Sequence, residues 1–270
     1  MSSLVRCQVD GQIATITLDS PANRNALSRA LVAELTSALR AAGQDAGIRA
    51  VVLTHTGGVF CSGADLSEAR QRPGGDTQAG PAPGSDGQAG MADATTAMMT
   101  VMTTIVQLAK PVIAKISGHV RAGGMGIVGA CDIAVATEEA TFAFTEARIG
   151  LAPAIISMTT LDLIRPRAAS RYYLTGETFG GTVAAQIGLI TEAISSGNID
   201  DAVARVAGQI CETSPQGAAE TKRLLTAGRR HRMAADSADL AALSARLFAS
   251  EEAQEGIRSF LERRAPAWRR

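Results

Sequence analysis

The sequence predicts a mixed α/β protein whose C-terminal part is mainly helical. Short runs rich in β-branched residues recur along the N-terminal half, and amphipathic segments with the helical repeat follow them. After about residue 154 the helical repeat dominates. Strands paired with helices, followed by helices alone, indicate an α/β core with a helical extension.

The N-terminal segment predicts a β-hairpin, a helix and a strand. In residues 4–19 (LVRCQVDGQIATITLD), two alternating runs flank Asp10-Gly11, which is a strong turn signal. In residues 28–43 apolar side chains recur at the spacing of one helix face. Ser28 suits the N-cap of this helix, and Gly43 suits its end. The β-branched run RAVVLT (residues 49–54) predicts a buried strand.

The middle of the chain predicts further strand–helix units around one segment that has no core. Residues 71–90 are rich in glycine, proline, serine and glutamine, so we expect a mobile loop there. The other expected elements are a helix over 91–108, a strand in KPVIAKISG (110–118), a glycine-rich loop that leads into a helix, a strand at 132–137 and an extended piece at 142–144.

The C-terminal part predicts helices that take part in assembly. Residues 236–264 form the longest amphipathic stretch, and Pro266 ends it. Its apolar positions exceed what a short monomer tail needs, and burying them would favour a closed ring of subunits. We therefore expect a core over residues 1–195 and a helical oligomerisation region over residues 196–270.

Composition argues against several classes of function. The formal net charge is +0 and the pI is near 6.8, which does not favour nucleic acid or an anionic membrane as a partner. The N-terminus is too polar for a signal peptide, and no apolar run reaches the roughly 20 residues that span a bilayer. The four scattered cysteines indicate a reducing, cytoplasmic location. The three histidines lack metal-ligand spacing, so we expect no metal site.

Two segments of small residues are candidates for a functional site. GGVFCSGADL (57–66) and SGHVRAGGMG (117–126) each follow a predicted strand and lead towards a helix. Side by side, they could direct two backbone N–H groups at one oxygen, as in an oxyanion hole. The alternative is a pair of tight turns that bind nothing. A phosphate-binding loop has little support, because the P-loop pattern is absent, and nothing basic lies beside Cys61 to make it a nucleophile.

Six segments of the sequence together carry a family resemblance. They are RNALS (24–28), FCSGADL (60–66), KPVIAKISGHVRAGGMGIVGACDIAVA (110–136), FAFTEARIGLAP (142–153), YYLTGETF (172–179) with AAQIGLITEAI (184–194), and SEEAQEGIRSFLERRAP (250–266). In this order they resemble the crotonase superfamily, also called the enoyl-CoA hydratase/isomerase family. The resemblance implies a spiral of ββα units, a helical C-terminal trimerisation region, and a homotrimer or a dimer of trimers. It also implies an acyl-CoA thioester as substrate, so coenzyme A is part of the substrate and no separate cofactor is expected.

By position, the resemblance implies that the backbone N–H groups of Ala64 and Gly123 hold the thioester oxygen. Such a loop needs no nucleophile, because the protein stabilises negative charge that spreads into the thioester. The segments RNAL and GADL resemble those that hold the coenzyme, although Arg24 could also be an exposed residue without a role. The substrate-binding residues implied in this way are Arg24, Ala26, Ala64, Asp65, Leu66, Gly123 and Gly124.

The resemblance also implies that one acid is missing. Hydratases of the family hold water between two glutamates; the first position is Gly126 in this chain, and the second is Glu146. One carboxyl group suits the transfer of a proton between two carbons, as in the Δ3,Δ2-enoyl-CoA isomerases. His119 and Arg121 could supply a further proton donor or meet an acidic substrate, or they could simply face solvent.

The sequence therefore favours an acyl-CoA-metabolising enzyme of the enoyl-CoA hydratase/isomerase type, a lyase or an isomerase, with Glu146 as acid and base. Two alternatives stay open: a hydratase that recruits water with Glu146 and backbone groups alone, and a non-catalytic acyl-CoA-binding homologue. For Glu146 itself, the alternative is a surface salt bridge with Arg148.

Overall fold

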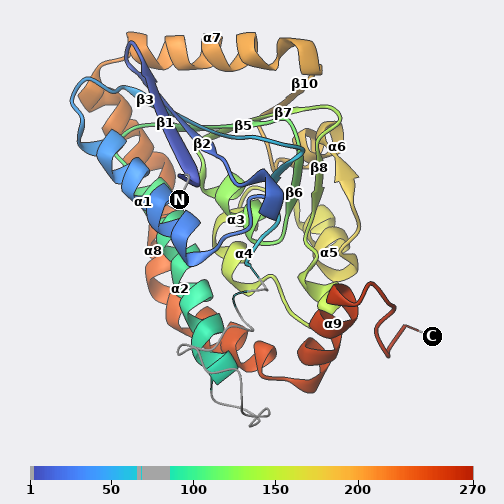
Figure 1. Ribbon diagram of the computed structural model, residues 1–270. Helices are drawn as coiled ribbons and strands as arrows, with labels where there is room; N and C mark the ends of the chain where they lie inside the picture. Colours follow the sequence, from blue (N-terminus) through green and yellow to red (C-terminus); the bar gives the residue numbers. More distant parts are fainter. Residues whose placement is uncertain (1–2, 66–67, 69–85, 270) are drawn as a thin grey trace.

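The computed structural model contains two β-sheets with helices packed on them, and it describes residues 3–65, Glu68 and residues 86–269 (Figure 1). The strands are β1 Val5–Asp10, β2 Ile13–Leu18, β3 Ala50–His55, β4 Val59–Cys61, β5 Val112–Ile116, β6 His119–Arg121, β7 Ile133–Thr137, β8 Thr141–Ala143, β9 Phe179–Gly180 and β10 Glu192–Ile194. The α-helices are α1 Arg29–Gln44, α2 Asp86–Gln107, α3 Gly123–Ala130, α4 Ala154–Thr160, α5 Pro166–Thr175, α6 Gly181–Ile187, α7 Ile199–Glu212, α8 Pro215–Phe248 and α9 Glu251–Leu261. The 3-10 helices are η1 Pro21–Asn23, η3 Glu146–Ile149 and η4 Ser196–Asn198.

The chain alternates between the two sheets. The larger sheet has the order β1-β2-β3-β5-β7-β10, and the smaller one has the order β4-β6-β8-β9. A short turn after β3, β5 and β7 leads directly into β4, β6 and β8, and helical structure follows each of these shorter strands. The repeat is thus strand, strand, helix, which confirms the predicted mixed α/β spiral of ββα units.

The N-terminal predictions are confirmed, with the hairpin turn shifted by one residue from Asp10-Gly11. β1 and β2 pair antiparallel, with Asp10 opposite Ile13, so the turn itself consists of Gly11 and Gln12. The side chain of Ser28 accepts a hydrogen bond from the Leu31 N–H and caps α1. The helix ends one residue after Gly43, at Gln44.

Two of the predicted boundaries are wrong. Helix α2 begins at Asp86, inside the segment predicted as a loop over 71–90; residues 71–85 lie outside the described residues. Helix formation is cooperative, so the apolar stretch that starts near Met91 extends the helix back through weaker residues. The stretch 236–264 is divided between α8 and α9 because Ser250 accepts a hydrogen bond from the Ala253 N–H and starts a new helix.

The central strands β3, β5 and β7 of the larger sheet are buried on both faces. Helix α7 covers one face, where its residues Ile199 and Val203 pack with Ile113 of β5 (Figure 1). Lys115 of β5 reaches the same face and forms an ion pair with Asp200 at the start of α7. The strands end with β10 and the later elements are helices, but α7 completes the core around the sheet. The division at residue 195 stays a prediction.

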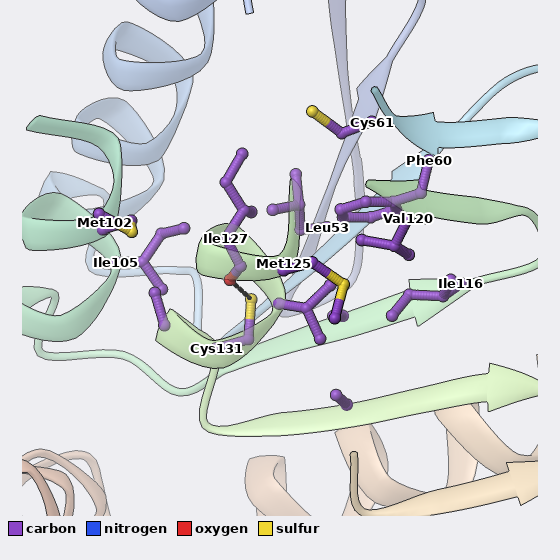
Figure 2. Close-up of a cluster of buried hydrophobic side chains, with 14 of the residues drawn as sticks. Leu53, Phe60, Cys61, Met102, Ile105, Ile116, Val120, Met125, Ile127 and Cys131 are labelled. Atoms are coloured by element: carbon purple, nitrogen blue, oxygen red, sulfur yellow. Dashed lines mark hydrogen bonds between the residues drawn. The ribbon is translucent and has the colours of Figure 1, made fainter. Parts of the chain in front are cut away.

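Helix α3 lies at the centre of the main core. All 8 of its residues are buried. Figure 2 shows this helix with Met102 of α2 on one side and Val120 of β6 on the other. Helix α8 fixes its C-terminal end, because Arg229 donates to the Gly129 carbonyl at 2.9 Å. Lys222 of α8, which is also buried, forms an ion pair with Asp132 at 2.7 Å, just after α3.

Several large apolar side chains are exposed on the later helices. Leu224 and Leu225 of α8 are 74% and 79% exposed, and Leu174 of α5 is 80% exposed. Such residues would suit a subunit contact, and the predicted trimer stays a prediction. Within the described ranges, none of the helices combines the length and the apolar character needed to cross a bilayer.

Candidate active site

Three parallel strands of the smaller sheet lead to the three predicted catalytic positions. β4 pairs in parallel with β6, and β6 pairs in parallel with β8. Ala64 follows the end of β4, Gly123 follows β6, and Glu146 follows β8. The carboxyl ends of parallel strands meet at one edge of a sheet. The predicted loops therefore leave short strands of the second sheet, and not the strands at 49–54 and 112–116 as the sequence indicated.

The turns that carry Ala64 and Gly123 touch each other. A Cβ atom placed on Gly63 would lie 2.8 Å from the Ala122 Cβ and 3.1 Å from the Gly123 nitrogen. Gly63 has a φ of +93°, a conformation that favours glycine. Within the described part of the chain, the N–H groups of Ala64 and Gly123 donate no backbone hydrogen bond. Both N–H groups are thus available to an oxygen atom of a ligand.

Ala122 holds a strained backbone conformation directly before α3. Its φ of 46° and ψ of −121° are unusual for a residue with a side chain, and such strain costs on the order of 1–3 kcal/mol. Its N–H donates to the carbonyl of Ala143 at the end of β8, at 3.2 Å. The strained turn makes Gly123 the first residue of α3, so the Gly123 N–H lies at the positive end of the helix dipole.

Asn25 organises the loop that carries RNAL, and sequence reasoning missed it. The residue is fully buried with a φ of 51°. Its side-chain oxygen accepts from the Ser20 N–H at 2.8 Å, and its amide donates to the carbonyl of Val59 at 2.7 Å. Asparagine tolerates the left-handed conformation better than most residues, which is the one local signal that singles it out.

The RNAL loop is joined to the segment around Ala64. The Leu27 N–H donates to the carbonyl of Gly63 at 2.8 Å, and Asn23 donates to the carboxylate of Asp65 at 2.8 Å. This brings the predicted coenzyme-binding residues of the two segments together, with Arg24 exposed and Ala26 buried. The predicted Leu66 lies outside the described residues.

Gly124 faces the smaller sheet. A Cβ atom placed on it would lie 2.8 Å from the carbonyl oxygen of Cys61 and 3.2 Å from Val120. The absence of a side chain therefore lets α3 pack closely on β4 and β6, and a part in substrate binding stays a prediction. Burial raises the pKa of the Cys61 thiol to about 12, so a thiolate at this position is strongly disfavoured.

Glu146 is a partly buried acid at the start of η3. Its Oε2 atom is buried and has no hydrogen-bond partner among the described residues, although other parts of the residue are accessible. Burial raises the pKa of the carboxyl group to about 7. Arg148 does not pair with it and instead donates to the carbonyl of Thr175 at 2.9 Å, so the surface salt bridge is wrong. A carboxyl group whose pKa is raised by burial, with one oxygen left unpaired among the described residues, is typical of a functional position.

Gly126 faces an apolar wall. A Cβ atom placed on it would lie 2.6 Å from the sulfur of Met102 and 2.8 Å from the Cγ2 of Ile156. Its carbonyl oxygen accepts from the hydroxyl of Thr159 at 2.9 Å. The space that a side chain of residue 126 would enter is therefore filled by α2 and α4.

His119 and Arg121 connect β6 to β8. The Nδ1 atom of His119 lies 2.8 Å from the hydroxyl of Thr141, and Arg121 donates to the Thr141 carbonyl at 2.7 Å. Between them, Val120 points into the core, so the two polar side chains lie on the other face of the strand. These contacts favour the structural interpretation of both residues over a role as proton donors.

Fold and site together define a class, the two-sheet spiral proteins of the crotonase type. The chain belongs to the enoyl-CoA hydratase/isomerase family, whose model matches residues 8–270. The crystal structure of an enoyl-CoA hydratase from Mycobacterium avium is 47% identical, with a TM-score of 0.87 over 99% of this chain and 100% of that chain.

Two further relatives extend the comparison. A carnitinyl-CoA hydratase from Mycobacterium avium is 27% identical, with a TM-score of 0.82 over 100% of this chain and 99% of that chain. Enoyl-CoA hydratase domain-containing protein 3, mitochondrial, from Danio rerio is 31% identical over 268 residues, which are 99% of this chain and 88% of that protein.

Proposed function

We propose that this protein is an enzyme that acts on acyl-CoA thioesters through an enolate-like intermediate. The N–H groups of Ala64 and Gly123 hold the thioester oxygen and stabilise the charge that develops on it. The proposal is supported by the contact between the two turns and by the absence of other acceptors for these N–H groups in the described chain. The position of Gly123 at the start of α3 adds the favourable end of a helix dipole.

The coenzyme part of the substrate is held by the joined RNAL and GADL segments. Arg24 is exposed and can pair with a phosphate, while Ala26 and Asp65 lie on the two connected loops. Leu66 and Gly124 complete the proposed set by family position. Because coenzyme A arrives with the acyl group, the reaction needs no separate cofactor.

Glu146 is the single acid and base of the proposed reaction, an isomerisation of 3-enoyl-CoA to 2-enoyl-CoA. Its carboxylate removes a proton from C2, and the electron pair of the broken C–H bond moves into the thioester carbonyl. The protonated Glu146 then returns the proton to C4, which leaves the double bond between C2 and C3. A pKa of about 7 suits both halves of this shuttle near neutral pH.

The observation that carries isomerisation over hydration is the apolar wall at Gly126. Addition of water is easiest when one carboxyl group polarises the water and another delivers a proton. Here Met102 and Ile156 fill the space that a second carboxyl group would need. One acid and an apolar wall suit proton transfer between two carbons of the same substrate.

Hydration is the second candidate, and the relatives favour it. Both Mycobacterium avium structures are named hydratases, and one of them shares 47% identity with this chain. In that mechanism Glu146 and backbone groups alone would hold the water. A non-catalytic acyl-CoA-binding protein would show binding without either reaction.

The test is Glu146→Gln, which keeps the size of the side chain but cannot accept a proton. Isomerisation of 3-hexenoyl-CoA and hydration of crotonyl-CoA are measured for the parent and the variant. We expect isomerisation to be the faster reaction of the parent and to fall on the order of 10²-fold or more in the variant. Glu139→Gln, which changes an exposed glutamate near β8, serves as the control and should stay within about twofold of the parent.

Three results would contradict the proposal in different ways. Unchanged isomerisation in Glu146→Gln would remove this residue from the mechanism. Hydration that exceeds isomerisation in the parent and depends on Glu146 would favour the second candidate. A parent that binds crotonyl-CoA in calorimetry but turns over neither substrate would identify a binding protein.

A further inference from the structure

Helix α9 lies directly on η3, the short helix that begins with Glu146 (Figure 1). A Cβ atom placed on Gly256 of α9 would lie only 2.4 Å from the carbonyl carbon and oxygen of Ile149. A Cβ atom placed on Gly150 would lie 2.7 Å from the carbonyl group of Glu252. Each backbone thus rests against a glycine of the other element, and neither contact leaves room for a side chain.

The face of α9 that meets η3 consists of small residues. Ala253, Gly256 and Ser259 follow one another at a spacing of three, so they share one side of the helix. Ala253 is 0% exposed and Ser259 is 2% exposed. Ser250 caps the helix immediately before this face begins. The close approach of α9 to η3 is therefore encoded in its sequence.

The residues that α9 touches are hydrogen-bonded to the backbone of Glu146. The N–H of Gly150 and the N–H of Leu151 both donate to the Glu146 carbonyl, the latter at 3.0 Å. Ile149 and Gly150 close the turn that Glu146 opens. A displacement of α9 that moves Ile149 would therefore change the position of Glu146 as well.

We propose that Gly256, by letting α9 lie on the backbone of Ile149, holds the Oε2 atom of Glu146 in a position that bulk water does not reach. Gly256 is a positioning residue in this account, since it contacts neither the substrate nor the carboxyl group. The catalytic consequence rests on the proposed function of Glu146, whereas the effect on its protonation does not.

Helices α9 and α5 pack on η3, and their titratable groups do not account for the raised pKa of Glu146. Burial is therefore its main cause. On α9, Glu255 is paired with Arg264 outside the helix, and the others are Glu251, Glu252 and Arg258. On α5, Arg167 is exposed and Arg171 is paired with Glu177. The pKa of Tyr173 is raised mainly by burial, so this phenol stays neutral. On η3 itself, Arg148 is bonded to a carbonyl. No charge on these elements replaces the lost water.

The sign of the expected pH effect follows from the raised pKa. The folded value is about 7 and the ordinary value is 4.5, so the neutral carboxyl group contributes stability below pH 4.5 that is lost as the pH rises through 7. Glu146→Gln cannot lose a proton. Its stability relative to the parent should therefore increase between pH 4.5 and pH 7 and stay constant above that range. This difference measures the protonation of Glu146 without any assay of activity.

The experiment compares Gly256→Ala with Gly208→Ala, each with and without Glu146→Gln. Gly208 is a matched control, because it also lies inside a helix but nothing lies within 4 Å of an added Cβ. We expect the pH at which the stability difference stops changing to fall from about 7 by at least one pH unit in Gly256→Ala only. We also expect kcat for 3-hexenoyl-CoA to fall roughly 10- to 100-fold, with KM changed by less than about threefold.

The outcomes separate this inference from the proposed function. If Gly256→Ala keeps both this upper pH limit and the kcat of the Gly208→Ala control, the inference is wrong and the role of Glu146 is untouched. If Gly256→Ala behaves as expected but Glu146→Gln does not reduce activity, the proposed function is wrong and the inference about Gly256 is kept. Should Gly256→Ala not fold, Ser250→Ala weakens the cap of α9 without touching η3. A smaller fall in the upper pH limit supports the inference, and an unchanged limit and kcat overturn it.

Discussion

Glu146 and Gly126 both follow the same edge of the smaller sheet, yet their surroundings are opposite. Glu146 is an acid whose Oε2 atom is buried without a partner in the described chain, and burial raises its pKa to about 7. Gly126 has no side chain, and two apolar side chains occupy the space beside it. At residue 146 the protein buries part of a carboxyl group, which costs free energy. At residue 126 the neighbouring apolar side chains leave no space for such a group.

This difference shows that the absence of an acid at residue 126 involves the packing of three helices, α2, α3 and α4, and not one residue alone. Met102 belongs to α2 and Ile156 to α4, and both approach α3 at Gly126. The apolar packing around α3 is continuous with the main core, as Figure 2 shows for Met102. A carboxyl group at residue 126 would therefore need changes in its neighbours before it could meet a substrate.

The largest effect on activity is expected at the contact between the turn of Ala64 and the turn of Gly123, because catalysis through either position depends on it. Gly63→Ala would place a Cβ atom 2.8 Å from the Ala122 Cβ and 3.1 Å from the Gly123 nitrogen. We expect kcat/KM to fall on the order of 10²- to 10³-fold for isomerisation and hydration alike, because the thioester oxygen loses its donors.

The control for Gly63→Ala is Gly11→Ala. Both glycines have a positive φ, but nothing lies within 4 Å of a Cβ atom on Gly11. Both variants carry the strain of the left-handed conformation, and only one disturbs the two turns. Equal losses of activity would show that general destabilisation, and not the oxyanion contact, explains the result.

A smaller effect is expected from Gly126→Glu, which sharpens the comparison directly. Overpacking against Met102 and Ile156 should lower the free energy of unfolding by about 1–3 kcal/mol, and burial of the charge should add to this. Urea unfolding measures the loss, and crotonyl-CoA hydration should not increase. Gly208→Glu places the same residue where nothing lies within 4 Å and should change stability little. Normal stability with faster hydration would mean that Met102 and Ile156 move aside easily, which would contradict this prediction.

Much of the fold could be predicted because local patterns encode it. Alternating runs around Asp10 predicted the first hairpin, and the capping residue Ser28 predicted the start of α1. The short strands β4, β6, β9 and β10 were missed because two or three residues cannot show a period of two. The second sheet, and with it the true origin of the site loops, consists largely of such strands.

The candidate site could be predicted only in part. Family position indicated Ala64, Gly123 and Glu146, and the sheet register brings all three loops to one edge. No local pattern indicates that the Oε2 atom of Glu146 has no partner among the residues that the structure describes. The contact between Gly150 and α9 was equally hidden, because it joins segments far apart in the chain. Such features depend on tertiary packing, which a single sequence does not display.

The central claim is that one buried carboxyl group carries the proton from C2 to C4, and isotope transfer tests it most directly. 3-Hexenoyl-CoA that carries deuterium at C2 is converted in ordinary water, and the position of the label in the product is determined by mass spectrometry and NMR. Because Oε2 of Glu146 is buried, we predict that a measurable share of the deuterium reappears at C4. Turnover at the full rate with no deuterium at C4 would show that water or a second group carries the proton, and the single-acid account would be wrong.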